Sequence, residues 1–194
     1  MSSSQKRTDK LALEYLKVEG FKSLRDATEA ELRPLTILAG NNSSGKSSLM
    51  QPLLLLKQTF DAPYDPGPLL LDGPNVAFSD VQQLFWYAPG GSRNRSFTVV
   101  LQRKPENSLT ITFRRATGKT KRQPESVHLA ECVWKFGQET LQLRPDMSKE
   151  EIEEAATIVL HPVVIGKIKD CSFAKVGVLY LENGCKDVDL TSYR

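Results

Sequence analysis

Residues 40–47 have the residue types and spacing of a loop that binds phosphate. Gly40 and Gly45 are followed by Lys46 and Ser47, which matches the pattern G-x-x-x-x-G-K-[ST]. In this pattern main-chain N–H groups surround the phosphates, the lysine reaches the β- and γ-phosphates, and the hydroxyl binds Mg²⁺. We therefore predict an ATP and Mg²⁺ site, with Ser47 on the metal. Its expected residues are Gly40, Asn41, Asn42, Ser43, Ser44, Gly45, Lys46, Ser47 and Ser48.

The segments on either side of this loop fit the elements that such a loop needs. Residues 35–39 form an apolar run, which predicts a buried parallel strand. A helix is expected from Lys46 to near Thr59, kinked at Pro52, where one helical hydrogen bond is lost. The leucines at helical spacing are Leu49, Leu53, Leu54 and Leu56. The alternative is an ordinary glycine- and serine-rich turn before a capped helix.

Ahead of the loop, the sequence "LKVEGFKSL" predicts two short antiparallel strands around residues 20–24. Together with "PLTILAGNNSSGKSSLMQ", it resembles the N-terminal lobe of the SMC/RecF/OLD-type ATPases, a branch of the ABC-ATPase superfamily. The resemblance covers residues 11–86. The aromatic-plus-basic pair of that family is Phe21 and Lys22 here. Asn42 stands at the family asparagine, and Ser43 replaces the more frequent third glycine, as in some members of the defence-associated branch.

The resemblance implies two further residues of the site. Lys22 is expected to approach the bound phosphates; the alternative is a solvated strand residue. The family also has a glutamine that senses Mg²⁺ and the γ-phosphate, and Gln82 or Gln83 stands in the corresponding region. The alternative for these glutamines is a polar helical surface.

Hydrolysis needs more than a phosphate-binding loop, because an acidic residue must hold the metal and a base must position water. In the family that the sequence resembles, a C-terminal lobe supplies an Asp-Glu pair after an apolar strand, and an S-G-G signature. No such run occurs here: Glu182 follows four apolar residues, but Asn183 stands where the second acid belongs, and residues 89–92 (PGGS) are typical of a turn. We therefore predict the first lobe without the second.

The remaining patterns predict an α/β fold: an incomplete P-loop NTPase core of ABC-ATPase type with an adjoining antiparallel β subdomain. Alternation predicts two hairpins, 96–102 with 108–115 and 126–136 with 139–143. Ser148 and Glu151 predict a capping box for a short helix, and two further strands are expected at 157–165 and 173–182. The expected organisation is a disordered tail at 1–10 and one lobe at 11–194, with its core at 11–60 and the β subdomain at 96–145.

Charge and composition limit the partners. The chain has 26 basic and 23 acidic residues, a net charge of +3, so no global field favours nucleic acid. One basic cluster is either a solvated hairpin tip or a contact for a nucleic-acid backbone; it comprises Arg114, Arg115, Lys119, Lys121 and Arg122. Three scattered cysteines match neither a disulfide framework nor a metal site, and His128 and His161 are expected to be packing residues. No apolar run spans a membrane and no secretory signal is present, so we expect a cytoplasmic protein without membrane contact.

These observations together predict the ATP- and Mg²⁺-binding half of an ABC-type ATPase head. We expect poor hydrolysis by the chain alone, and completion by a homo-oligomer or by a second ATPase-lobe chain. The resemblance implies an output in nucleic-acid handling, including nuclease control in antiphage defence. Two alternatives stay open: a nucleotide-sensing scaffold that never hydrolyses, and a small-molecule P-loop kinase, which the antiparallel strand content disfavours.

Overall fold

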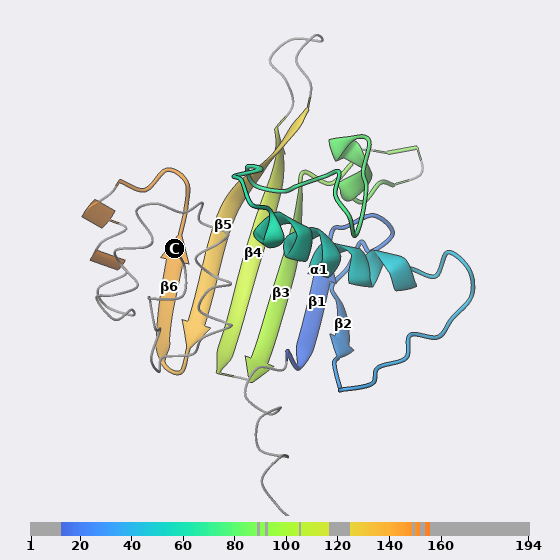
Figure 1. The fold of residues 1–194 in the computed structure, drawn as a ribbon, viewed down its shortest axis with the longest axis horizontal. Helices are drawn as coiled ribbons and strands as arrows, with labels where there is room; N and C mark the ends of the chain where they lie inside the picture. Colours follow the sequence, from blue (N-terminus) through green and yellow to red (C-terminus); the bar gives the residue numbers. More distant parts are fainter. Residues whose placement is uncertain are drawn as a thin grey trace, which may run out of the picture.

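A six-stranded sheet forms the centre of the molecule (Figure 1). The computed structural model describes residues 13–88, 90–91, 93–104, 106–116, 125–148, 150–151 and 154–155. The strand order is β2-β1-β3-β4-β5-β6, and all neighbouring strands are antiparallel. The strands are β1 (Tyr15–Glu19), β2 (Thr28–Glu31), β3 (Ser96–Lys104), β4 (Asn107–Ala116), β5 (Ser126–Phe136) and β6 (Glu139–Leu143).

The strands predicted from alternation are confirmed. The β1–β2 pair precedes the glycine-rich loop at residues 40–47, and β3–β4 and β5–β6 form the two expected hairpins. Because side chains alternate across a strand, every second residue points to the same face of the sheet. Val99 and Ile111 are fully buried. A pairing that local patterns do not predict joins β1 to β3. The residues before the loop and the antiparallel hairpins therefore share one sheet.

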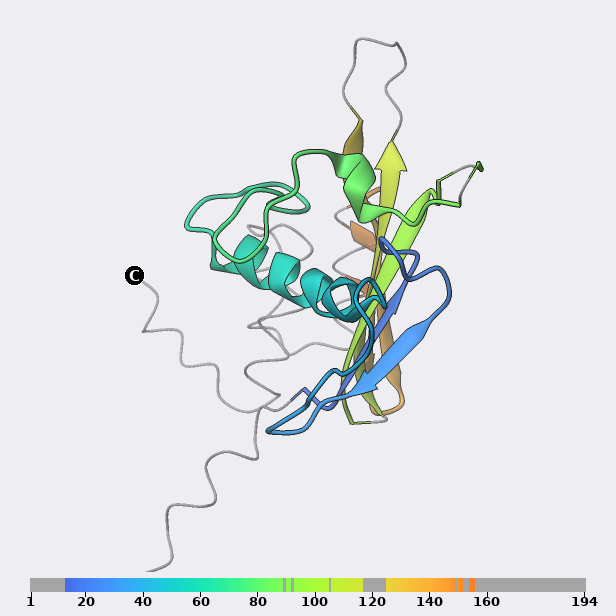
Figure 2. The ribbon, with the colours of Figure 1, turned by 90° about the vertical axis from the view of Figure 1, so that its right-hand side faces the viewer.

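Helix α1 (Lys46–Asp61) lies across one face of this sheet (Figure 2). The expected helix is confirmed and continues through Pro52, which is itself buried. Its buried residues recur at helical spacing and include Leu49, Leu55 and Leu56, whereas Leu53 and Leu54 are half-buried. The buried residues of α1 and of the strands form one hydrophobic cluster, so the sheet fixes the direction in which the helix N-terminus points.

The strand expected at residues 35–39 is not present. The segment has no strand conformation, and among the described residues none pairs with it. Leu35 is 78% exposed and Ile37 is 79% exposed, so the expectation of a buried strand is wrong. The physical reason is that a parallel strand needs neighbours that satisfy its N–H and C=O groups. The described strands make their hydrogen bonds within the antiparallel sheet instead.

Smaller predictions have mixed outcomes. The capping box is confirmed, since Ser148 N donates to Glu151 Oε2 at 2.7 Å and Glu151 N donates to Ser148 Oγ at 3.2 Å. The turn before β3 is confirmed by the hydrogen bond from Gly91 N to Ala88 O at 2.9 Å. His128 is not a packing residue: its ring is exposed and lies 2.8 Å from Ser126 Oγ.

Several predictions lie outside the described residues. These are the tail at 1–10, the strands at 157–165 and 173–182, His161, Cys171, Cys185, and Lys119, Lys121 and Arg122 of the basic cluster. Among the residues that are described, no helix is long and apolar enough to cross a membrane.

Candidate functional site

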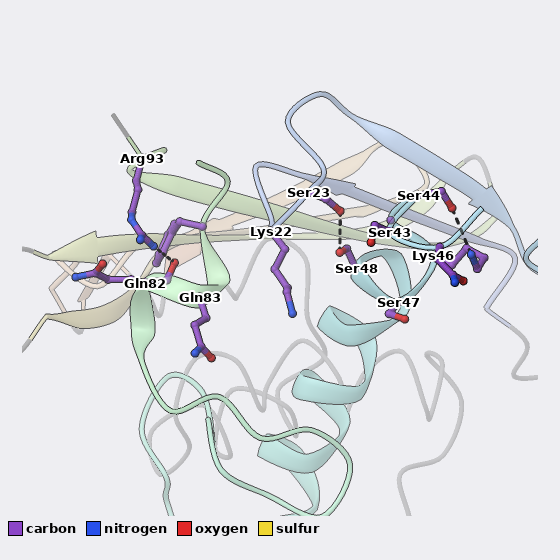
Figure 3. Close-up of a pocket in the computed structure, with 13 residues that line it drawn as sticks. Lys22, Ser23, Ser43, Ser44, Lys46, Ser47, Ser48, Gln82, Gln83 and Arg93 are labelled. Atoms are coloured by element: carbon purple, nitrogen blue, oxygen red, sulfur yellow. Dashed lines mark hydrogen bonds between the residues drawn. The ribbon is translucent and has the colours of Figure 1, made fainter. Parts of the chain in front are cut away.

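A pocket of about 820 Å³ opens beside the N-terminus of α1 (Figure 3). Seven of the nine predicted loop residues line it, from Asn42 to Ser48, and Lys22 joins them from the turn after β1. Gly40 and Asn41 are not part of the lining. Sequence reasoning missed three lining residues, which are Ser23, Phe85 and Arg93. The pocket therefore combines the loop with two segments far from it in sequence.

Gly45 gives the helix N-terminus its shape. It is the N-cap residue of α1 with φ of 91°, a left-handed conformation that glycine adopts without a steric penalty. A Cβ at this position would lie 3.0 Å from Leu24 Cδ2 and 3.2 Å from Ser23 Oγ. No side chain caps the helix, and its first turn contains no acidic residue. The first N–H groups of α1 are thus left for an anion, which the helix dipole also favours.

The Lys46 ammonium group lies against the loop that precedes it. Lys46 Nζ donates to the carbonyl oxygens of Gly40 at 2.8 Å and Asn41 at 2.6 Å, and lies 3.4 Å from Ser44 Oγ. Gly40 and Asn41 therefore hold the lysine through their main chains and do not line the pocket. Phosphate oxygens are stronger acceptors for an ammonium group than neutral carbonyl oxygens, so a bound phosphate would compete for these hydrogen bonds.

Backbone strain is concentrated at this pocket. In the part of the chain that the structure describes, two non-glycine residues have positive φ: Lys22 at 50° and Ser43 at 63°. Both line the pocket. Such conformations cost free energy and are typical of binding sites and switches. The Lys22 conformation is held by a hydrogen bond from its N–H to Leu84 O at 3.1 Å, and its Nζ lies 5.2 Å from the centre of the Phe78 ring.

A hydroxyl pair connects the Lys22 turn to the helix. Ser23 Oγ donates to Ser48 Oγ at 2.9 Å, and Ser48 is buried. Ser47, the predicted metal ligand, has an exposed side chain at the same helix end. Since the turn and the helix are joined here, Lys22 is held at a fixed position relative to the loop.

The wall of the pocket away from the loop contains both candidate glutamines. Gln82 and Gln83 lie in a short 3₁₀-helix, η1 (Val81–Leu84), which Asp80 caps by accepting from Gln82 N at 2.7 Å. In Figure 3 the Gln83 side chain extends in the same direction as Lys22, whereas the Gln82 side chain extends away from α1. Arg93 completes this wall. No local sequence pattern singles out Arg93, because its place depends on the loop that returns to β3.

The residues present fit the phosphates of a nucleotide. They provide an uncapped helix N-terminus, three cationic side chains (Lys22, Lys46 and Arg93) and several hydroxyl groups. They fit a metal ion less fully. The residues that line the pocket include no carboxylate, and the described part of the chain has no cluster of three or more His, Cys, Asp or Glu residues. Ser47 is the hydroxyl ligand that the loop pattern offers, and Mg²⁺ keeps its remaining positions for phosphate and water.

Comparison with known proteins agrees with this geometry. A family model described as an AAA ATPase domain matches residues 12–131, which is more than half of the chain and includes the whole pocket. No curated protein matches the chain.

Proposed function

Since this chain belongs to the AAA ATPase domain family, we propose that it is the ATP- and Mg²⁺-binding half of an ABC-type ATPase head. The proposal is supported by the resemblance of the sequence to the N-terminal lobe of the SMC/RecF/OLD-type ATPases. The observation that carries the proposal is the uncapped N-terminus of α1, which faces a pocket with Lys46 on the loop side and Lys22 on the side of the sheet.

Different residues of the pocket are suited to different parts of the triphosphate. The N–H groups from Ser43 to Ser47 would hold the α- and β-phosphates. Lys46, which now donates to the carbonyl oxygens of Gly40 and Asn41, would donate to phosphate oxygens instead. Ser47 would supply its hydroxyl to Mg²⁺. Lys22 lines the pocket from the turn after β1, so its charge would balance that of the terminal phosphate. The bound nucleotide supplies a cleavable γ-phosphate, and the protein binds it, orients it and compensates its charge.

Two features support completion by another lobe. The pocket lining contains no carboxylate to hold the metal during hydrolysis. The apolar segment 35–39, next to the loop, exposes Leu35 and Ile37. Burying such a side chain yields about 1.5–3 kcal/mol. We therefore propose that a second lobe, from a homo-oligomer or from another chain, packs near this segment and supplies the acid. The proposed output in nucleic-acid handling and antiphage defence is supported by the family resemblance.

A second candidate is a nucleotide-sensing scaffold without hydrolysis, which the lack of a carboxylate in the lining also favours. Phosphate release separates the two. A half head releases almost no phosphate alone and gains activity when a second lobe is added. A scaffold releases none in either state. A small-molecule kinase is disfavoured because such kinases alternate strands with helices, whereas the described sheet is antiparallel.

Nucleotide binding is tested by titration calorimetry with Mg·ATP on the full chain. We expect Lys46→Ala to weaken binding by about tenfold or more, about 1.4 kcal/mol, because the cation that faces the phosphates is lost. Lys57→Ala is the matched control: Lys57 lies on the same helix but is paired with Asp61 far from the pocket. Equal affinity of wild type and Lys46→Ala, or no binding by wild type, would contradict the assignment.

A further inference from the structure

Arg93 is held in place by two contacts at the pocket wall. Its Nη1 donates to the carbonyl oxygen of Gln82 at 2.8 Å, and its guanidinium lies 5.1 Å from the centre of the Tyr87 ring. Tyr87 and Arg93 also form an isolated β-bridge, and Asn94 N donates to Trp86 O at 2.9 Å. Arg93 is therefore half-buried and fixed, unlike a solvated surface arginine.

The element that Arg93 contacts has little stability of its own. The 3₁₀-helix η1 contains four residues, and such short helices depend on groups outside them. Asp80 holds its beginning through the hydrogen bond to Gln82 N. At its end, Gln82 O accepts from Phe85 N at 3.3 Å and from Arg93. A cation at this end is also favoured by the direction of the peptide dipoles.

This contact connects Arg93, through Gln82, to Gln83, whose side chain extends in the same direction as that of Lys22 (Figure 3). Gln83 follows Gln82 directly, has an exposed side chain, and its Nε2 lies 3.0 Å from Ser79 Oγ. The loop amides, which line the same pocket, would hold the α- and β-phosphates of a bound nucleotide. The phosphate that ATP has and ADP lacks would then be available to Gln83 and Lys22, which also line the pocket.

We propose that Arg93 is a positioning residue that sets the preference of this site for a nucleoside triphosphate over a diphosphate. It fixes η1 through the Gln82 carbonyl and thereby places Gln83 against the terminal phosphate. The inference rests on the proposed nucleotide site and adds to it a residue that the loop motif does not contain. Arg93 acts through Gln83 and makes no direct contact with the phosphate.

The test measures the dissociation constants of the full chain for Mg·ATP and Mg·ADP by titration calorimetry. For Arg93→Ala we expect the ATP-over-ADP preference to fall by about fivefold or more, with ADP affinity within about twofold of wild type. Arg93→Gln and Arg93→Lys keep an N–H donor for the Gln82 carbonyl and should restore most of the preference. Arg25→Ala is the matched control, because Arg25 lies 5.2 Å from the Trp86 ring without lining the pocket.

A double variant tests whether Arg93 acts through Gln83. Gln83→Ala should lose the preference, and adding Arg93→Ala to it should change little, because both changes remove the same contact. The proposal is overturned if Arg93→Ala keeps the wild-type ratio of ATP to ADP affinity, or if it lowers the two affinities equally. It is also overturned if Arg93→Lys restores the ratio and Arg93→Gln does not, because that result would indicate direct contact of a charge with phosphate.

Two outcomes have a separate meaning. If wild type binds neither nucleotide, the proposed function itself fails, and the inference fails with it. If Arg93→Ala does not fold, as judged by its thermal melt without nucleotide, the proposal is tested by the Gln83→Ala variant alone. A wild-type ratio in Gln83→Ala would then overturn the proposal, because no contact with the terminal phosphate would be left for Arg93 to position.

Discussion

The interior of the sheet and the segment that precedes the glycine-rich loop at residues 40–47 are both apolar in sequence, but they differ in exposure. Val99 in β3 and Ile111 in β4 are 0% exposed, whereas Leu35 is 78% and Ile37 is 79% exposed. The strands of the sheet have neighbours for their main-chain groups and α1 over one face, and residues 35–39 have neither among the described residues. Apolar character therefore gives a tendency to be buried, and a partner in space decides whether burial occurs.

The largest effect should come from the interior of the sheet. Phe97 is 2% exposed, and its ring centre lies 5.2 Å from that of Phe21, 5.5 Å from that of Phe85 and 5.0 Å from that of Phe113. Phe97→Ala should lower the free energy of unfolding by about 3–5 kcal/mol, because a cavity replaces these contacts. Urea unfolding measures the loss. A loss below about 1 kcal/mol would mean that the sheet interior is not closely packed.

A second prediction concerns the exclusion of water from the same interior. Burial raises the pKa of the Cys132 thiol from 9.0 to about 12. Above pH 9 the unfolded chain loses this proton while the folded chain keeps it, so stability decreases with rising pH until about pH 12. The slope contributed by Cys132 should be about 1.4 kcal/mol per pH unit once the unfolded thiol is ionised. Unfolding at several alkaline pH values measures it.

Cys132→Ala provides the reference for this pH dependence, because every other ionisable group is the same in both proteins. The variant is expected to have the shallower slope between pH 9 and 11. Identical slopes would show that water reaches the thiol, and the contrast between a dry sheet and an exposed loop segment would be weaker than the structure indicates.

The third prediction separates stability from binding on the loop side of the molecule. Lys22 has φ of 50°, a conformation that asparagine tolerates better than lysine. Lys22→Asn should therefore leave the free energy of unfolding unchanged or raise it by up to about 1 kcal/mol, while Mg·ATP affinity falls several-fold. Urea unfolding and calorimetry measure the two quantities.

Lys17→Asn is the control for that pair of measurements. Lys17 lies in β1, pairs with Glu29 at 2.8 Å and does not line the pocket. This change should lower the free energy of unfolding slightly and leave the affinity for Mg·ATP unchanged, which is the reverse of the result expected for Lys22→Asn. A loss of stability without a loss of affinity in Lys22→Asn would show that Lys22 serves the fold and not the site.

The smallest effect is expected in the exposed segment itself. The double change Leu35→Ser and Ile37→Ser removes apolar side chains that are already in water, so the free energy of unfolding should change by about 0.5 kcal/mol or less. This is the direct counterpart of Phe97→Ala. A loss of more than about 2 kcal/mol would indicate that the segment is buried in solution, and the comparison between the two regions would no longer hold.

The features that local physics governs were predictable from the sequence. Gly45 and Lys46 stand at the helix start because the loop pattern needs a left-handed glycine there. The hairpins follow from alternation, and the capping box follows from two residues three positions apart, Ser148 and Glu151. Each of these depends on neighbours within a few residues. Of the four leucines at helical spacing, Leu49 and Leu56 are buried, whereas Leu53 and Leu54 are half-buried.

The glycine-rich loop at residues 40–47, the helix that follows it and the antiparallel hairpins could be predicted from the sequence, because each forms through contacts between residues close in the chain. The burial of particular apolar runs, the pairing of β1 with β3, and the meeting of Lys22, Gln83 and Arg93 at one pocket became evident only in the folded molecule. These outcomes depend on hydrogen bonds and packing between distant segments, whose free energy no local pattern encodes.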